Sequence, residues 1–315
     1  MTAHADSTRI RHLLTLEGLP RETIAGLLER AEAVLPHAHG GTAKRGVLAG
    51  KAVCTLFFEP STRTRSSFQL AAMRLGADVL DFNAASSSSK KGESDADTLR
   101  TLEAMGVQGF VVRHARDGAV AELASIAGDG TSLVNAGDGR HAHPTQGLLD
   151  MLTLRQAKGP DFGRLKVLIV GDVKHSRVAR SDLHALRTLG AGEIRVCGPS
   201  ALLPEPGVLE GCTVTTDLDA ALDGVDAVMA LRLQHERMES GLVSSLEDYR
   251  RDYGLSARRL RIAAADAVVM HPGPMNRGVE IDADVADGPQ SRILSQVANG
   301  VAVRMAVLEA LLARA

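Results

Sequence analysis

Apolar runs that suggest buried strands alternate with helix-period segments along nearly the whole chain, and this alternation restricts its fold most. Such repetition implies a parallel sheet covered by helices on both faces. Strands are expected at 52–58, 77–82, 109–113, 132–136, 165–172, 193–198, 212–216, 226–232 and 267–274. Helices are expected at 20–35, 66–75, 95–105, 117–127, from Thr145 onward, at 176–189, and from Ser291 to Leu312.

The chain is too long for one ordinary hydrophobic core. Its 315 residues fit two domains of about 150 residues each. The strand and helix repetition pauses at 158–164 and then restarts, which puts the domain boundary near residue 150. We therefore expect an α/β protein with two doubly wound parallel-sheet domains, residues 1–150 and 151–290, followed by a C-terminal helix segment, 291–315.

Hydroxyl and arginine side chains alternate where the first strand ends, in "FFEPSTRTRSSFQL" (57–70). A strand that ends at Phe58 and a helix that starts near Thr62 would place "STRTR" at a helix N-terminus. Free backbone N–H groups and the helix dipole favour an anion there, and arginine offers a fork matched to phosphate oxygens. The carboxyl end of a parallel strand is also where ligands bind in open α/β sheets. The alternative is an ordinary Ser/Thr N-cap with solvated arginines.

Other polar residues stand at further expected strand ends. A single arginine there is usually a surface charge, but several at one sheet edge per domain favour a cleft for a polyanionic ligand. In "HPGP" (271–274) the prolines remove N–H donors and fix the backbone, so that carbonyl groups can point into such a cleft. The other strand-end residues are Arg113, His143, Gln146, Arg177 and Arg232.

Composition and motifs exclude several classes of function. A net charge of −2, a pI near 6.6, 3% aromatic residues and no Trp argue against a general nucleic-acid binder. No signal peptide is visible, and no apolar run approaches the roughly 20 residues that span a bilayer. The sequence has no Walker A motif, no G-x-G-x-x-G after 165–172, and no H-E-x-x-H or paired C-x-x-C motif, so no metal site is expected. Cys54 and Cys197 lie in apolar runs, as reduced thiols of a cytoplasmic protein would.

Seven motifs resemble aspartate carbamoyltransferase catalytic chains, in the aspartate/ornithine carbamoyltransferase superfamily, and occur in the same order. They are "FFEPSTRTR", "SSSSKKGES", "VVRHA", "HPTQ", "VGDVKHSRVARS", "LRLQHER" and "MHPGPMNRGVE", and the resemblance spans about residues 8 to 310. "STRTR" and "HPTQ" are shared with ornithine enzymes. "HPGPMNRG" discriminates better, because ornithine enzymes resemble "HCLP" there and carry a Ser-Met-Gly segment that this chain lacks.

The resemblance implies a role for each matching residue. Catalytic contacts are implied for Thr64, Lys91, Arg113 and His143. Carbamoyl phosphate would be bound by Ser61, Thr62, Arg63, Thr64, Arg113, His143, Gln146, Pro272, Gly273 and Pro274. L-aspartate would be bound by Lys91, Arg177, Arg232 and Gln234. Glu59 would pair with Arg177 and Arg237 across the two domains. Gly273 departs from the Leu of some family members, which loosens the loop but leaves its carbonyl in place.

The implied reaction transfers the carbamoyl group of carbamoyl phosphate to L-aspartate and needs no cofactor and no metal. It is the committed step of de novo pyrimidine (UMP) biosynthesis. The resemblance also implies a substrate cleft between the domains, a C-terminal helix that packs back on the first domain, and a cytoplasmic homotrimer. In this trimer Lys91, with Ser87 beside it, would reach a neighbour's active site. Regulatory or dihydroorotase-like chains are further expected partners, while nucleic acid and membrane are not.

Two alternatives remain open at the level of sequence. A carbamoyltransferase with another amino-acid acceptor would differ at 232–240 and 271–277. A catalytically silent scaffold subunit of a pyrimidine-pathway assembly should lack Arg63, Lys91 or His143, and all three are present.

Overall fold

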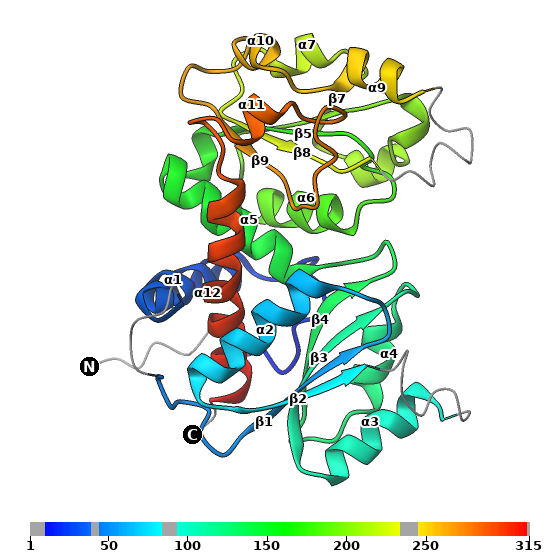
Figure 1. Cartoon of the computed structure of the whole chain (residues 1–315), viewed down its shortest axis with the longest axis vertical. Helices are drawn as coiled ribbons and strands as arrows, with labels where there is room; N and C mark the ends of the chain where they lie inside the picture. The colour runs from blue at the N-terminus through cyan, green and yellow to red at the C-terminus, as the bar shows by residue number, and fades with distance from the viewer. Residues whose placement is uncertain (1–9, 39–43, 84–92, 234–244, 314–315) are drawn as a thin grey trace. The chain divides into compact units, whose positions relative to one another are not determined.

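The computed structural model describes residues 10–38, 44–83, 93–233 and 245–313, which fall into two compact units (Figure 1). Unit 1 consists of Met1–Leu152 and Ala298–Ala315. Its four strands are all parallel, in the order β2-β1-β3-β4. They are β1 (Ala52–Phe57), β2 (Asp78–Asn83), β3 (Val107–His114) and β4 (Ser132–Asp138). The helices are α1 (Arg21–Ala38), α2 (Thr62–Leu75), α3 (Asp95–Ala104), α4 (Ala119–Ile126), and parts of α5 (Pro144–Lys158) and α12 (Ile293–Leu312).

Helices cover both faces of the unit 1 sheet. On one face, Cys54 of β1 clusters with Leu99 of α3 and Leu123 of α4. On the other face, α12 comes so close to β3 that a Cβ atom at Gly109 would lie 2.7 Å from the Leu312 side chain. Consecutive strand residues point to opposite faces, so a strand covered on both sides is mostly apolar. The sequence of β1 has this cause, and its one polar residue, Thr55, donates a hydrogen bond to Asp81 (2.7 Å).

Helix α12 is largely apolar, but Arg304 and Glu309 interrupt it, so it is not an unbroken apolar run. It is 20 residues long with a mean hydropathy of 1.2, which is long and apolar enough to cross a membrane by length and composition. The protein itself buries 67% of this stretch, as expected for the core helix of a folded domain. Its contact with β3 accounts for that burial.

Unit 2, Thr153–Val297, contains a second parallel sheet, with five strands in the order β7-β6-β5-β8-β9. They are β5 (Lys166–Val170), β6 (Glu193–Cys197), β7 (Thr213–Thr215), β8 (Ala227–Ala230) and β9 (Val268–Met270). The unit's own helices are α6 (Arg177–Leu189), α7 (Leu218–Leu222), α9 (Leu246–Tyr253), α10 (Ala257–Leu260) and α11 (Ala283–Ala286). Figure 1 shows α6 on the opposite side of the strands from α7 and α10. The expected class, two α/β domains with parallel sheets, is confirmed.

Two expectations about elements of unit 2 were wrong. The strand expected at 267–274 ends at Met270, because the two prolines that follow cannot donate ladder hydrogen bonds. The polar stretch 233–257, in which the sequence predicts no helix or strand, includes α9. The Ser245 side chain accepts a hydrogen bond from the Asp248 N–H (2.9 Å) and caps this helix. Leu246, Tyr249 and Tyr253 of α9 lie on one face and pack together, but the helix is only eight residues long and its other residues are charged, so its apolar pattern is short.

Candidate active site

Strand register brings three segments of unit 1 to one sheet edge. Phe57 of β1 pairs with Arg113 of β3, and His114 of β3 pairs with Asp138 of β4. All three strands are parallel, so their carboxyl ends meet at the same edge. The residues expected to bind an anion follow directly from these ends.

The first segment is the start of α2, whose N-cap residue is Ser61. Ser61 is extended (φ −162°, ψ 102°), and its side chain makes no capping hydrogen bond. At the starts of α3 and α6, by contrast, Ser94 and Ser176 accept backbone N–H bonds. The alternative of an ordinary side-chain cap is therefore not what the structure shows at Ser61. A helix start of this kind suits an anionic ligand.

The two arginines of "STRTR" differ. Arg65 lies 3.5 Å from Asp81, and its guanidinium stacks on the Phe57 ring at 5.0 Å, so it supports the unit's own structure. Arg63 is exposed at the first turn of α2, and Thr64 beside it is buried, with 8% of its surface exposed. The anion-binding prediction therefore rests on residues 61–64, and Arg65 is a structural residue, not the solvated arginine of the alternative interpretation.

Arg113 lies at the carboxyl end of β3 and is 9% exposed. Its Nη1 donates to the Ala136 carbonyl (3.2 Å), and its Nη2 donates to Glu59 Oε1 (3.1 Å). These bonds hold the guanidinium at the edge where α2 begins. Glu59 was predicted to pair across the domains. It contacts Arg113 here, and the interdomain pairing stays a prediction.

The third segment follows β4 and begins α5. The His143 carbonyl accepts the Gln146 N–H (2.9 Å), which starts the helix, and both side chains are buried. Gln146 Nε2 donates to both carboxylate oxygens of Asp150, at 3.1 and 3.2 Å. Asp150 was missed at the sequence level. Its only signal was a helical i, i+4 spacing from Gln146.

Unit 2 has a corresponding edge, because β5, β8 and β9 are parallel neighbours. Arg177 is the first residue of α6 after β5, and Arg232 lies two residues beyond β8. Both are half-buried. The buried Nε of Arg232 has no hydrogen-bond partner among the described residues. This edge therefore carries two guanidinium groups, as a dicarboxylate ligand would need.

The segment 271–274 follows β9 at the same edge of unit 2. The Gly273 N–H donates to His271 Nδ1 (2.8 Å), so Nε2 carries the ring proton of the neutral imidazole and faces Glu280 Oε1 at 3.3 Å. Gly273 has a φ of 62°, a left-handed conformation that glycine adopts at little cost. Burial raises the pKa of Tyr249 far above its usual range, and Glu280 and Asp172 nearby add to this, so the phenol stays neutral. Sequence reasoning missed the pair of His271 and Glu280.

Several predicted site residues lie outside the described residues. These are Lys91, with Ser87 beside it, Gln234 and Arg237. Within the described ranges, no three His, Cys, Asp or Glu side chains lie close enough together to hold a metal ion.

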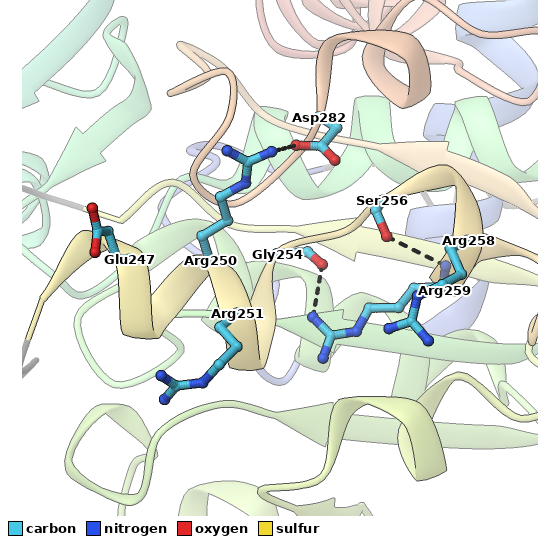
Figure 2. A pocket seen from close by; sticks show the side chains of 8 residues that line it. All are labelled: Glu247, Arg250, Arg251, Gly254, Ser256, Arg258, Arg259 and Asp282. Carbon is cyan, nitrogen blue, oxygen red and sulfur yellow. Dashed lines mark hydrogen bonds and ion pairs between the residues drawn. The ribbon is translucent and has the colours of Figure 1, made fainter.

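A separate cavity of about 500 Å³ lies in unit 2. Figure 2 shows the residues that line it, most of which belong to α9 and α10. It is rich in arginine, but much of this charge is balanced. Arg250, Arg251 and Arg259 form ion pairs of 3.1, 2.6 and 2.8 Å with Asp282, Asp248 and Asp219. We therefore assign no anion site to this cavity.

Comparisons with known proteins support the motif-based resemblance. Residues 11–156 match the carbamoyl-phosphate-binding domain of aspartate/ornithine carbamoyltransferases, and residues 164–311 match their Asp/Orn-binding domain. The aspartate carbamoyltransferase catalytic subunit of Xanthomonas euvesicatoria pv. vesicatoria (strain 85-10) is 72% identical over 304 residues, 96% of each chain.

Two solved structures are also similar to this chain. One is aspartate transcarbamoylase from Trypanosoma cruzi in complex with carbamoyl aspartate and phosphate, at 33% identity, a TM-score of 0.86 and 97% of each chain. The other is ornithine carbamoyltransferase from Thermus thermophilus, at 27% identity and a TM-score of 0.84, covering 96% of this chain and 99% of that one. The fold, the strand-end residues and these matches agree, and the chain belongs to the aspartate/ornithine carbamoyltransferase family.

Proposed function

We infer that this chain is an aspartate carbamoyltransferase, an enzyme that transfers the carbamoyl group of carbamoyl phosphate to the amine of L-aspartate. Its products are N-carbamoyl-L-aspartate and phosphate, and the reaction commits carbon to pyrimidine biosynthesis. One observation carries the chemistry: residues 61–64, Arg113 and Gln146 meet at one sheet edge of unit 1. The acceptor follows from the 72%-identical relatives, which are aspartate enzymes.

In unit 1, the start of α2 binds the phosphate group of carbamoyl phosphate. The N–H groups of the first turn, the hydroxyls of Ser61, Thr62 and Thr64, and the Arg63 guanidinium supply the donors. Arg113, His143 and Thr64 then face the carbamoyl carbonyl oxygen. In unit 2, Arg177 and Arg232 hold the carboxylates of L-aspartate, with Gln234 and Lys91 as further predicted contacts.

The reaction is a direct displacement. The aspartate amine attacks the carbonyl carbon and forms a C–N bond, and negative charge develops on the carbonyl oxygen. The bond from carbon to the phosphate oxygen then breaks, phosphate leaves with its electron pair, and the proton of the amine passes to the departing phosphate. The fixed cation of Arg113 stabilises the oxyanion, and ordering the two substrates lowers the entropic part of the barrier. No step needs a covalent enzyme intermediate.

We extend this proposal to the assembly and its compartment. The enzyme forms a homotrimer in which Lys91 completes a neighbour's site, and regulatory or dihydroorotase-like chains are candidate partners. Cytoplasmic location fits the thiols: burial raises the pKa values of Cys54 and Cys197 to about 12, which keeps them protonated and unreactive.

The test is an assay of the full chain with carbamoyl phosphate and single amino acids, measuring carbamoylated product and released phosphate together. We expect one phosphate per N-carbamoyl-L-aspartate with L-aspartate, and no product above the enzyme-free blank with L-ornithine. Product with a different amino acid alone would reassign the acceptor. A folded chain that forms product with none of them would not be a catalytic subunit.

A further inference from the structure

Gln146 is held by an acceptor-only partner. The Gln146 Nε2 group donates to both carboxylate oxygens of Asp150, at 3.1 and 3.2 Å. An ionised carboxylate cannot donate, so the amide must turn its nitrogen toward Asp150 and its oxygen away. Among the described residues, no donor is bonded to Gln146 Oε1. This oxygen is therefore a fixed hydrogen-bond acceptor at the sheet edge where Arg113 lies.

Asp150 itself is fully buried, and a buried carboxylate stays ionised only with compensating charge or hydrogen bonds. Arg304 of α12 supplies such a charge. It is 4% exposed, and burial lowers its pKa to about 10, while attraction to Asp150 acts in the opposite direction. Arg304 is thus still cationic near neutral pH. It is also the only basic residue of α12, which is otherwise largely apolar.

Phe68 and Gly300 border the position of the Arg304 guanidinium. The Arg304 guanidinium lies 5.0 Å from the centre of the Phe68 ring. Phe68 belongs to α2 and follows Thr64 by about one helical turn. A Cβ atom at Gly300 would collide with Arg304 Nη1, so any larger residue there would displace the guanidinium. The helix that starts the phosphate site, α2, and the C-terminal helix, α12, thus jointly hold the Arg304 guanidinium, which is close enough to Asp150 for the two charges to attract.

We propose that Asp150, kept ionised by Arg304, is a positioning residue that presents Gln146 Oε1 to the carbamoyl NH2 group and so selects carbamoyl phosphate over acyl phosphates. The proposal rests on the proposed function. The NH2 group is the part of the substrate that must donate hydrogen bonds, and acetyl phosphate carries a methyl group in its place. A misoriented Gln146 would offer its own NH2 group to the substrate's NH2 group, which pairs two donors.

The experiment measures dissociation constants of carbamoyl phosphate, acetyl phosphate and inorganic phosphate for the full-length protein by calorimetric titration. For Asp150→Asn we expect the preference for carbamoyl over acetyl phosphate to fall about tenfold, the worth of roughly one hydrogen bond. Affinity for inorganic phosphate should stay within about twofold, because phosphate has no NH2 group. An equal loss for all three ligands would show a merely structural role, and an unchanged preference would also overturn the proposal.

Four further variants complete the test. Gln146→Leu should lose the same preference, and adding Asp150→Asn to it should change nothing more, because Asp150 acts through Gln146. Additive losses would contradict this. If Asp150→Asn leaves Arg304 uncompensated and fails to fold, Asp150→Asn/Arg304→Gln removes both charges and should show the same loss. Asp138→Asn, a buried carboxylate of the same unit, is the control and should keep the preference. A wild-type protein that binds no carbamoyl phosphate would reject the proposed function instead.

Discussion

Arg113 is a cation whose orientation the protein fixes before any ligand binds. Its side chain is largely buried, and two hydrogen bonds, to the Ala136 carbonyl and to Glu59, fix the plane of the guanidinium. A fixed cation away from bulk water stabilises a developing oxyanion without reorganising during the reaction. The bond to Glu59 also offsets the cost of burying the charge when the site is empty.

Arg113→Ala should lower kcat by about 10² to 10³, the usual cost of losing one oxyanion donor. The strand should still form, since the alanine Cβ keeps its place in β3. Steady-state kinetics measure the effect, and circular dichroism checks the fold. Arg116→Ala is the matched control: this nearby arginine is 53% exposed and paired with Glu122, so activity should stay near that of the wild type. A folded Arg113→Ala protein with near-normal turnover would remove Arg113 from the proposed mechanism.

At the scale of elements, the segments that follow the strands contain the proposed site residues, and a few buried hydrogen bonds determine the conformation of these segments. The 271–274 segment contains two prolines, so few of its backbone groups can hold it in place. The bond from the Gly273 N–H to His271 Nδ1 is therefore important, and the contact of His271 Nε2 with Glu280 sets the tautomer that can accept it.

Two substitutions of His271 separate these bonds. An asparagine oxygen can take the position of Nδ1 and accept the Gly273 N–H, whereas glutamine reaches toward Glu280 and loses that bond. We expect His271→Asn to keep about fivefold more activity than His271→Gln, at similar melting temperatures, because one buried hydrogen bond is worth roughly 1 kcal/mol. Kinetics and thermal denaturation measure the two effects. If the order of activities is reversed, the Glu280 contact, and not the Gly273 bond, determines the shape of the segment.

Some elements could be predicted from sequence because their cause is local. The apolar run of β1 and the hydroxyl-rich start of α2 each have a pattern that a short window reveals, and the structure agrees at both. Helix α9 is only eight residues long, so its capping serine and three apolar residues, Leu246, Tyr249 and Tyr253, give a short pattern in a polar stretch. The hydrogen bond of Arg113 to Glu59 and the electrostatic attraction between Arg304 and Asp150 join residues 54 and 154 positions apart, respectively. Packing alone determines such contacts.

Strand β1 also makes a pH-dependent contribution to stability. Burial of Cys54, with Asp81 nearby, raises the pKa of its thiol from 9.0 to about 12. The folded state therefore holds a proton that the unfolded state releases above pH 9. This contribution is fully present below pH 9 and is lost as pH rises toward 12, by at most about 4 kcal/mol. Denaturant unfolding between pH 8 and 11 should show a shallower decline for Cys54→Ala than for wild type. Cys212→Ala, at a half-buried position, should keep the wild-type slope, and equal slopes for all three proteins would contradict the prediction.

At the scale of the whole molecule, one chain is proposed to be an incomplete enzyme. Lys91 occurs in "SSSSKKGES", a polar stretch with no apolar pattern to tie it to its own core, and it lies outside the described residues. A lysine in such a stretch is usually a solvated surface charge. Family resemblance instead implies that it enters a neighbouring active site in a closed trimer, where each subunit donates a residue to the next.

Mixing two inactive variants distinguishes these alternatives. Lys91→Ala and Arg63→Ala chains should each be inactive alone, because every site of either trimer lacks one predicted contact. When they are mixed, dissociated and reassociated, a mixed trimer contains an interface where Arg63 of one chain meets Lys91 of the next. Activity should then return, at up to about one site per trimer, because the interface runs head to tail around the ring. Native mass spectrometry verifies subunit exchange, and mixing each variant with itself is the control. If exchange is complete and activity stays at the level of the controls, Lys91 serves its own chain or none, and the shared-site proposal is wrong.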